Sequence, residues 1–109
     1  MKVQVLTVLA AALAAAPAFA NEPQVGRWAA DPQSCSGAAS LMVTATTVRR
    51  SEEACTIGKM YKADRALYIE GRCSSGGIVT RHPITLQMKG ERLAVTWNGE
   101  RLQEMQRCP

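Results

Sequence analysis

Apolar and polar residues alternate most clearly between Leu67 and Cys73. One face of this segment holds Leu67, Ile69, Gly71 and Cys73, and the other holds Tyr68, Glu70 and Arg72. A period of two is typical of a β-strand that has one face in a core. The segment therefore predicts a half-buried strand that turns Cys73 towards the interior.

Segments 41–48, 84–88 and 93–97 are rich in β-branched residues or alternate in the same way, and each predicts a further strand. Turn residues separate these segments, and the pair Asn98 and Gly99 is the strongest short hairpin signal among them. Turns recur about every 8 to 12 residues, which favours about five to seven short strands. The predicted fold class is all-β: a small antiparallel meander forming a barrel or sandwich.

Two segments fit this pattern less well. Residues 49–54 are charged, and we expect a crossing that contains one helical turn capped by Ser51. A two-residue turn after Trp97 would set Leu93 opposite Glu104, which mixes an apolar and an acidic side chain on one face. We therefore expect a bulge, or a different strand partner, in the last strand.

The first 20 residues differ in composition from the rest of the chain. They start with a positive Lys2, continue as an apolar run to Ala16 and end in Ala18-Phe19-Ala20, with small residues at the positions that a signal peptidase reads, the pattern of a secretory signal peptide. A retained membrane anchor is the alternative, but the run would span only about 21 Å of a bilayer core about 30 Å thick. We expect a signal peptide over 1–20, a single domain over 21–109, export to the periplasm or the medium, and no stable membrane insertion after cleavage.

Cleavage would also change the composition. The hydrophobic content is 47 %, much of it in 1–20, and the formal net charge of +4 falls to +3 because that segment holds Lys2 and no acid. A small charge of mixed sign in an exported domain argues against a nucleic-acid partner. We expect a monomer whose partner is an unknown protein or an envelope component.

Four cysteines in a short exported chain indicate a disulfide framework. They are Cys35, Cys55, Cys73 and Cys108, and no two have the close spacing of zinc ligands. The chain has a single histidine, so we expect neither a metal nor another cofactor.

These cysteines allow three pairings, which the sequence alone leaves open. We prefer Cys55 with Cys73, because this bridge would join neighbouring strands, and Cys35 with Cys108, because it would tie the two ends of the domain together. In the chain-entropy description the two loops would contribute about 3 and about 4.5 kcal/mol to stability.

Candidate catalytic groups are few. Alternation from Ile78 places His82 on the core face, where a buried neutral ring held by a hydrogen bond is a better interpretation than a general base. Paired carboxylates would suit glycoside hydrolysis, yet the acids fall on turns or outward positions and we interpret them as solvated charge. They are Glu52, Glu53, Glu70, Glu91, Glu100 and Glu104. We therefore predict no catalytic residue.

Arginines recur along the predicted strands. Arg72, Arg81 and Arg101 would form a cationic stripe if the strands align, and such a face suits an anionic polysaccharide, lipid headgroups or an acidic protein. Acidic residues interleave with them, so a solvated surface without a ligand is the alternative. We identify these three residues as a possible anion-binding face.

The layout of the chain also carries a resemblance. It combines Gly26-x-Trp28, Asp31 and Pro32 before Cys35, a central Cys55 and Cys73, and Arg107 before Cys108. This layout resembles uncharacterised small exported alphaproteobacterial four-cysteine proteins, a resemblance that implies no known activity. Gly-x-Trp with a nearby cysteine is also similar to small periplasmic β-barrel protease inhibitors. The four-cysteine pattern departs from theirs, so no inhibitory residue carries over.

These observations favour a non-catalytic periplasmic binding or inhibitor-like module that contacts a protein or an envelope component. A domain of 89 residues leaves little room for a cleft with several converging polar groups. The alternative is an envelope structural or stress protein that binds anionic polymer through surface arginines, and a small hydrolase is the third hypothesis.

Overall fold

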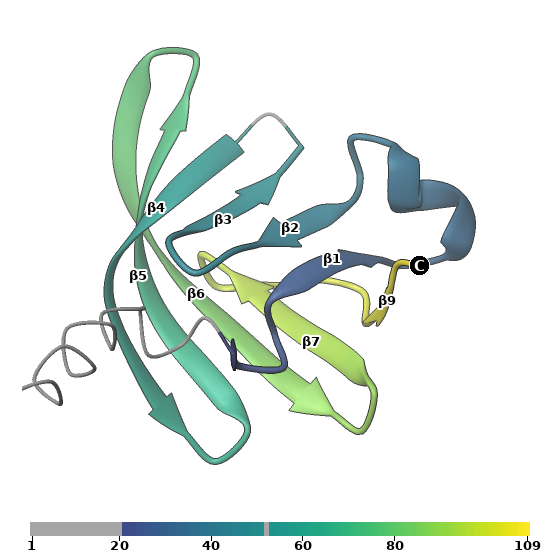
Figure 1. Cartoon of the computed structure of the whole chain (residues 1–109). Helices are drawn as coiled ribbons and strands as arrows, with labels where there is room; N and C mark the ends of the chain where they lie inside the picture. Colours follow the sequence, from purple (N-terminus) through teal and green to yellow (C-terminus); the bar gives the residue numbers. More distant parts are fainter. Residues whose placement is uncertain (1–20, 52) are drawn as a thin grey trace, which may run out of the picture.

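The computed structural model describes residues 21–51 and 53–109, so the expected signal peptide over 1–20 lies outside the described residues. The elements are β1 (Gly26–Ala29), the 3-10 helix η2 (Pro32–Ser36), β2 (Leu41–Val43), β3 (Thr47–Arg50), β4 (Glu53–Ala63), β5 (Ala66–Ser75), β6 (Ile78–Lys89), β7 (Arg92–Trp97), β8 (Glu100–Arg101) and β9 (Met105–Arg107). Eight strands close an antiparallel barrel in the order β6-β5-β4-β3-β2-β1-β9-β7, and pairing of β6 with β7 completes the ring (Figure 1). The all-β prediction is confirmed, in its barrel form.

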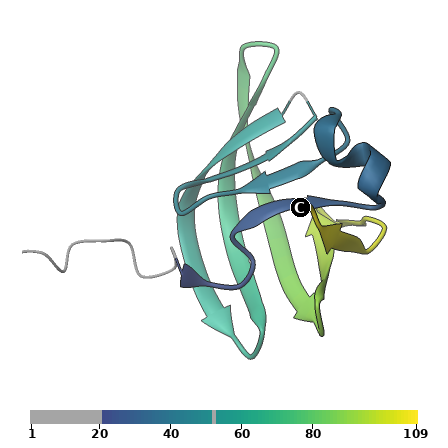
Figure 2. The same ribbon diagram turned by 45° about the vertical axis from the view of Figure 1, so that its right-hand side comes forward.

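Strands β4, β5 and β6 are the longest and form one wall of the barrel. The β5–β6 hairpin extends beyond its neighbours, as the upper ends of Figures 1 and 2 show. Its turn consists of Gly76 and Gly77, whose φ values of +62° and +85° lie in the region that glycine reaches without strain. Strand β7 pairs with β6 only from Ile84 onwards, so the outer part of the hairpin has no β7 beside it.

Inward-facing side chains fill the barrel, and the largest fully buried ones are Trp28, Leu41, Leu67, Ile84, Leu86 and Leu93. The end opposite the β5–β6 turn is sealed by the buried Gln24. Its side-chain Nε2 donates to the main-chain carbonyls of Arg65 and Leu86, at 3.0 and 3.2 Å. The Trp28 indole donates to the Gln24 carbonyl at 2.9 Å. The barrel therefore has one closed end and one end at which the long hairpin projects.

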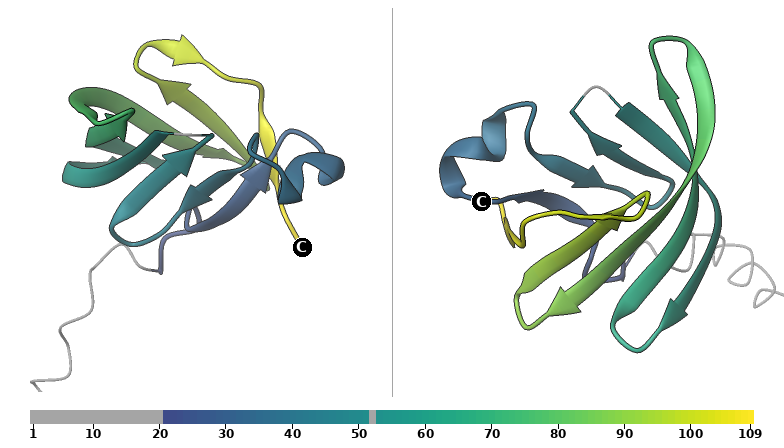
Figure 3. Two further views of the ribbon diagram at one scale, coloured as in Figure 1. Left: turned by 90° about the horizontal axis from the view of Figure 1, so that it is seen from above. Right: turned by 180° about the vertical axis from the view of Figure 1, so that it is seen from behind.

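Both preferred disulfides are present. Cys55 and Cys73 are bonded to each other across β4 and β5, and both are buried, as the alternation around Cys73 predicts. Cys35 in η2 is bonded to Cys108, which follows β9, and β9 lies beside β1 (Figure 3). The second bridge joins residues 73 apart in sequence, so it ties the beginning of the described fold to its end.

The charged segment 49–54 contains no helical turn among its described residues, so that prediction is wrong. Arg50 pairs directly with Glu53, and Ser51 has a φ of +51°, which makes the connection a tight β3–β4 hairpin. The short turn leaves no residues free for a helix, because both flanking stretches are already paired as strands.

The expected bulge near the C-terminus is confirmed. Trp97 pairs with Glu100, but Leu93 pairs with Met105, so the register shifts by one residue between β8 and β9. The shift sets the buried Met105 opposite Leu93 and leaves Glu104 exposed.

None of the described helical segments is long and apolar enough to cross a bilayer.

Candidate functional site

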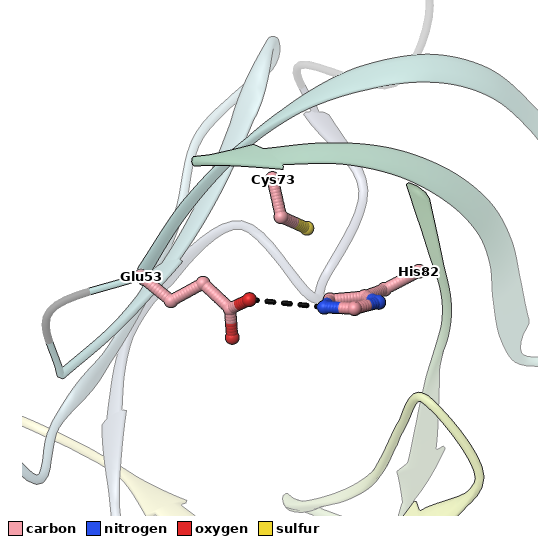
Figure 4. A group of neighbouring side chains, drawn as sticks. All are labelled: Glu53, Cys73 and His82. Carbon is pink, nitrogen blue, oxygen red and sulfur yellow. Dashed lines mark hydrogen bonds and ion pairs between the residues drawn. The ribbon is translucent and has the colours of Figure 1, made fainter. Parts of the chain in front are cut away.

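The end of the barrel from which the β5–β6 hairpin projects holds a polar cluster formed by Glu53, His82 and Trp97, here called the mouth cluster. Glu53 on β4 and His82 on β6 point towards each other across the interior, with His82 Nε2 3.0 Å from Glu53 Oε2 (Figure 4). The Trp97 indole on β7 donates to Glu53 Oε1 at 3.0 Å. The His82 and Glu53 side chains are 18 % and 24 % exposed. Three strands are thus joined through one carboxylate.

His82 lies on the inward face, as its alternation predicts, and is held by hydrogen bonds. It differs from the prediction in being only partly buried. Its Nδ1 lies 3.0 Å from the Arg81 carbonyl and its Nε2 faces the Glu53 carboxylate. Both ring nitrogens therefore face oxygen atoms of other groups.

The prediction that Glu53 is solvated surface charge is wrong. The tight β3–β4 hairpin starts β4 at this residue, and Glu53 then shares the inward face with Cys55, two positions later. The two-residue spacing of Glu53 and Cys55 is a sequence signal for this shared face. A helical turn at 49–54, as expected from the charged composition, would not produce it. Glu91, Glu100 and Glu104 are exposed, Glu70 is partly exposed on the outside of β5, and Glu52 lies outside the described residues.

Two residues of the mouth cluster also belong to a group with metal-ligand potential. One ligand atom each of Glu53, Cys73 and His82 lies within 4.8 Å of the others. The Cys73 sulfur, however, is bonded to Cys55 and offers no thiolate. One carboxylate and one imidazole remain, fewer than the three or four protein ligands of a zinc site.

The cluster also lacks the geometry of a nucleophilic triad. The nearest hydroxyl, Thr80 Oγ1, lies 3.3 Å from His82 Nε2, the same nitrogen that contacts Glu53. In a triad the acid contacts one ring nitrogen while the other faces the nucleophile. Here the acid and the hydroxyl both face Nε2, while a main-chain carbonyl faces Nδ1, so these three residues do not have the order of a triad.

A second candidate lies on the outside of the barrel, along β4, β5 and β6. A hollow of about 580 Å³ is lined there by Lys59, Tyr61, Tyr68, Glu70, Arg81 and Thr85, among others, and is here called the outer groove. Tyr61 and Tyr68 pair directly across β4 and β5, and their rings stack with centroids 5.0 Å apart and planes 15° apart. The two side chains are 65 % and 37 % exposed, so they form an open aromatic platform.

The arginines expected to bind anions are only partly brought together. Arg72 and Arg81 pair directly across β5 and β6, and line a smaller hollow with Lys59 and Glu70 at the β4 bulge. Among the described residues, neither arginine nor Lys59 has an acidic partner within 4 Å. Arg101 lies two strands away on β8, level with Thr96 of β7, which places it roughly 16 Å from Arg81 by strand geometry.

Tyr61 and Lys59 were not identified from the sequence. Strand β4 runs on to Ala63, past Gly58, and its register with β5 shifts between Ile57 and Lys59. This bulge moves Lys59 and Tyr61 to the outer face, whereas simple alternation from Cys55 would direct them inward.

The tip of the projecting β5–β6 hairpin also exposes apolar side chains. Ile78 and Val79 are each 68 % exposed. With Tyr61 and Tyr68 they are the large hydrophobic residues that the described part of the chain exposes, and all four lie on β4, β5 or β6. One wall of the barrel therefore carries both the outer groove and the apolar hairpin tip.

Comparisons of the chain with protein-family models, with curated proteins and with solved structures each return no match. No catalytic family is thus indicated for it. Two disulfides are typical of a protein that folds in an oxidising compartment outside the cytoplasm.

Proposed function

We propose that the protein is a non-catalytic, monomeric binding module of the periplasm or the medium, which contacts a partner protein through the outer wall of β4, β5 and β6. One observation carries the proposal: the four exposed large hydrophobic residues of the described chain all lie on these three adjacent strands. Exposed apolar side chains on one wall of a small domain are typical of an interaction surface, and tyrosines are favoured at such surfaces.

The polar groups of the mouth cluster support binding over catalysis. Both carboxylate oxygens of Glu53 and both ring nitrogens of His82 contact other protein groups. These contacts link β4, β6 and β7, which favours a structural role for the cluster.

Capture of a partner by the exported protein tests this proposal. The full-length chain is expressed for export, purified in oxidised form, immobilised and exposed to the extracytoplasmic fraction of the producing cells. We expect Tyr61→Ser/Tyr68→Ser to reduce the captured partner about tenfold, which corresponds to about 1.4 kcal/mol. Tyr61→Phe/Tyr68→Phe retains the platform and should bind normally, as should Arg27→Ser on β1. Equal capture by the serine variant and the wild type would overturn the proposal.

A second candidate is an envelope structural or stress protein that binds anionic polymer through surface arginines. It is favoured by the adjacent Arg72 and Arg81, which have no acidic partner among the described residues. Retention on a heparin matrix should then fall steeply with salt and should weaken in Arg72→Gln/Arg81→Gln. Arg27→Gln/Arg101→Gln is the matched control, because it also removes two exposed positive charges, on β1 and β8. Retention on heparin that does not change with salt concentration would exclude this candidate.

A further inference from the structure

The upper part of β6 has an unpaired edge. Strand β5 pairs with β6 from Ile78, whereas β7 pairs with it only from Ile84. No other described strand lies beside residues 78–83 on the β7 side. An unpaired strand edge presents main-chain N–H and C=O groups to any extended segment that can reach it.

One hydrogen bond shows which groups face this edge. The main-chain N–H of Asn98 donates to the Pro83 carbonyl at 2.8 Å, so this carbonyl points away from β5. In an antiparallel strand the main-chain groups of alternate residues point to the same side. The groups of Arg81 and Val79 therefore point to the open side, whereas those of Thr80 point to β5.

The side chains around this edge define the chemistry of a partner. Arg81 is exposed on the outer face, and Arg72 lies directly opposite it on β5. Val79 and Ile78 add exposed apolar surface at the hairpin tip. Between residues 78 and 83 the edge carries no acidic residue. A segment lying here would meet positive charge on one face and apolar surface at its end.

We propose that this edge binds an extended, acidic segment of a partner protein, which adds a strand to the sheet beside β6. The inference rests on the proposed function, because it specifies the partner chemistry on the same wall. The main-chain groups of Val79 and Arg81 provide the pairing, and carboxylates on the outer face of the added strand meet Arg81 and Arg72.

A second copy of this chain fits the edge less well. Antiparallel self-pairing centred on Thr80 would set Val79 of each copy opposite Arg81 of the other. It would also bring Arg72 and Arg81 of both copies onto one face, where like charges repel. The charge of the edge therefore favours an acidic partner over self-association.

Amide exchange and NMR shifts of the exported protein test the inference with a defined probe. The probe is a blocked eight-residue peptide of alternating Glu and Val. Matched peptides carry Lys in place of Glu, or are N-methylated at alternate residues so that they cannot pair along one edge. We expect the Val79 and Arg81 amides to exchange freely in the unbound protein. The Glu peptide should slow their exchange about tenfold, and neither control peptide should do so at equal concentration.

Other outcomes would overturn the inference. Shifts of the arginine side chains without protection of the two amides would indicate charge attraction of the kind that an anionic polymer provides. Equal protection by the Lys peptide would contradict the inference that the partner segment is acidic. Protection in the free protein that rises with its own concentration would assign the edge to a second copy.

A pair of variants separates this inference from the proposed function. Val79→Pro removes an edge N–H while leaving the β5 side of the ladder intact, and proline is tolerated at such edge positions. Val79→Ile keeps the N–H, the strand preference and the exposed apolar surface. We expect partner capture to be lost in Val79→Pro and retained in Val79→Ile, with unchanged exchange at Thr80 as the check that the hairpin is intact. If both variants capture normally while Tyr61→Ser/Tyr68→Ser does not, the edge inference fails and the proposed function stands.

Discussion

The Glu53 carboxylate accepts a hydrogen bond from the Trp97 indole at 3.0 Å, and its other oxygen lies 3.0 Å from His82 Nε2. Removing this side chain leaves the indole N–H of the buried Trp97 without a partner and leaves His82 Nε2 only the Thr80 hydroxyl, 3.3 Å away. We expect Glu53→Ala to lower the free energy of unfolding by about 2 kcal/mol, as measured by urea denaturation. Glu91→Ala, at an exposed turn, should change it by less than about 0.5 kcal/mol. Similar values for the two variants would contradict a structural role for Glu53.

The arrangement of His82 predicts an absence of turnover. Purified oxidised protein should hydrolyse chromogenic ester, peptide and glycoside substrates no faster than His82→Ala does, because the acid and the neighbouring hydroxyl face the same ring nitrogen. Initial rates at several protein concentrations provide the measurement. A hydrolysis rate that rises with protein concentration and disappears in His82→Ala would contradict the proposed binding function and indicate an enzyme.

The two disulfides differ in the length of chain that they constrain. Cys35→Ala/Cys108→Ala should cost about 4.5 kcal/mol through the entropy of the unfolded chain, because this bridge encloses the larger loop. Denaturation of oxidised protein measures the loss. Peptide mapping without reduction should recover Cys35 linked to Cys108 and Cys55 linked to Cys73. A Cys35–Cys55 peptide would contradict the described fold.

Gly71 lies on β5 where the wall of the barrel is tightly packed. An added Cβ would lie 3.2 Å from both Cys55 Cβ and Ile84 Cδ1, and Cys55 is held by its disulfide. We expect Gly71→Ala to destabilise the fold by about 1 to 3 kcal/mol. Gly37→Ala is the control, since its nearest contact would be an ordinary 3.8 Å. Thermal unfolding of the two variants should separate them, and equal midpoints would argue against close packing at Gly71.

Much of the fold follows from local pattern. Alternation around Cys73 predicts both its burial and the strand that carries it, and the conflict between Leu93 and Glu104 predicts the bulge before β9. The alignment of Arg72 with Arg81 follows from a two-residue turn at Gly76 and Gly77. These features depend on residues close in sequence, for which turn geometry and period are sufficient.

The site depends on features that local pattern does not provide. Tyr61 faces outward because the bulge at Gly58 reverses the alternation of β4, and the partner strand determines where that bulge forms. Glu53 reaches the interior because the β3–β4 turn is shorter than its charged composition indicates. Arg101 lies apart from the other two arginines because β7 separates β8 from β6.

The placement of the cysteines sets how much of the chain each disulfide requires. Cys55 and Cys73 lie on consecutive strands, so their bridge requires no residue beyond β5. Strands β6, β7, β8 and β9 all come later, and Cys108 follows the last of them. The bridge that ties the two ends of the barrel together therefore requires the complete chain, whereas a chain that stops after β5 already holds both cysteines of the other bridge.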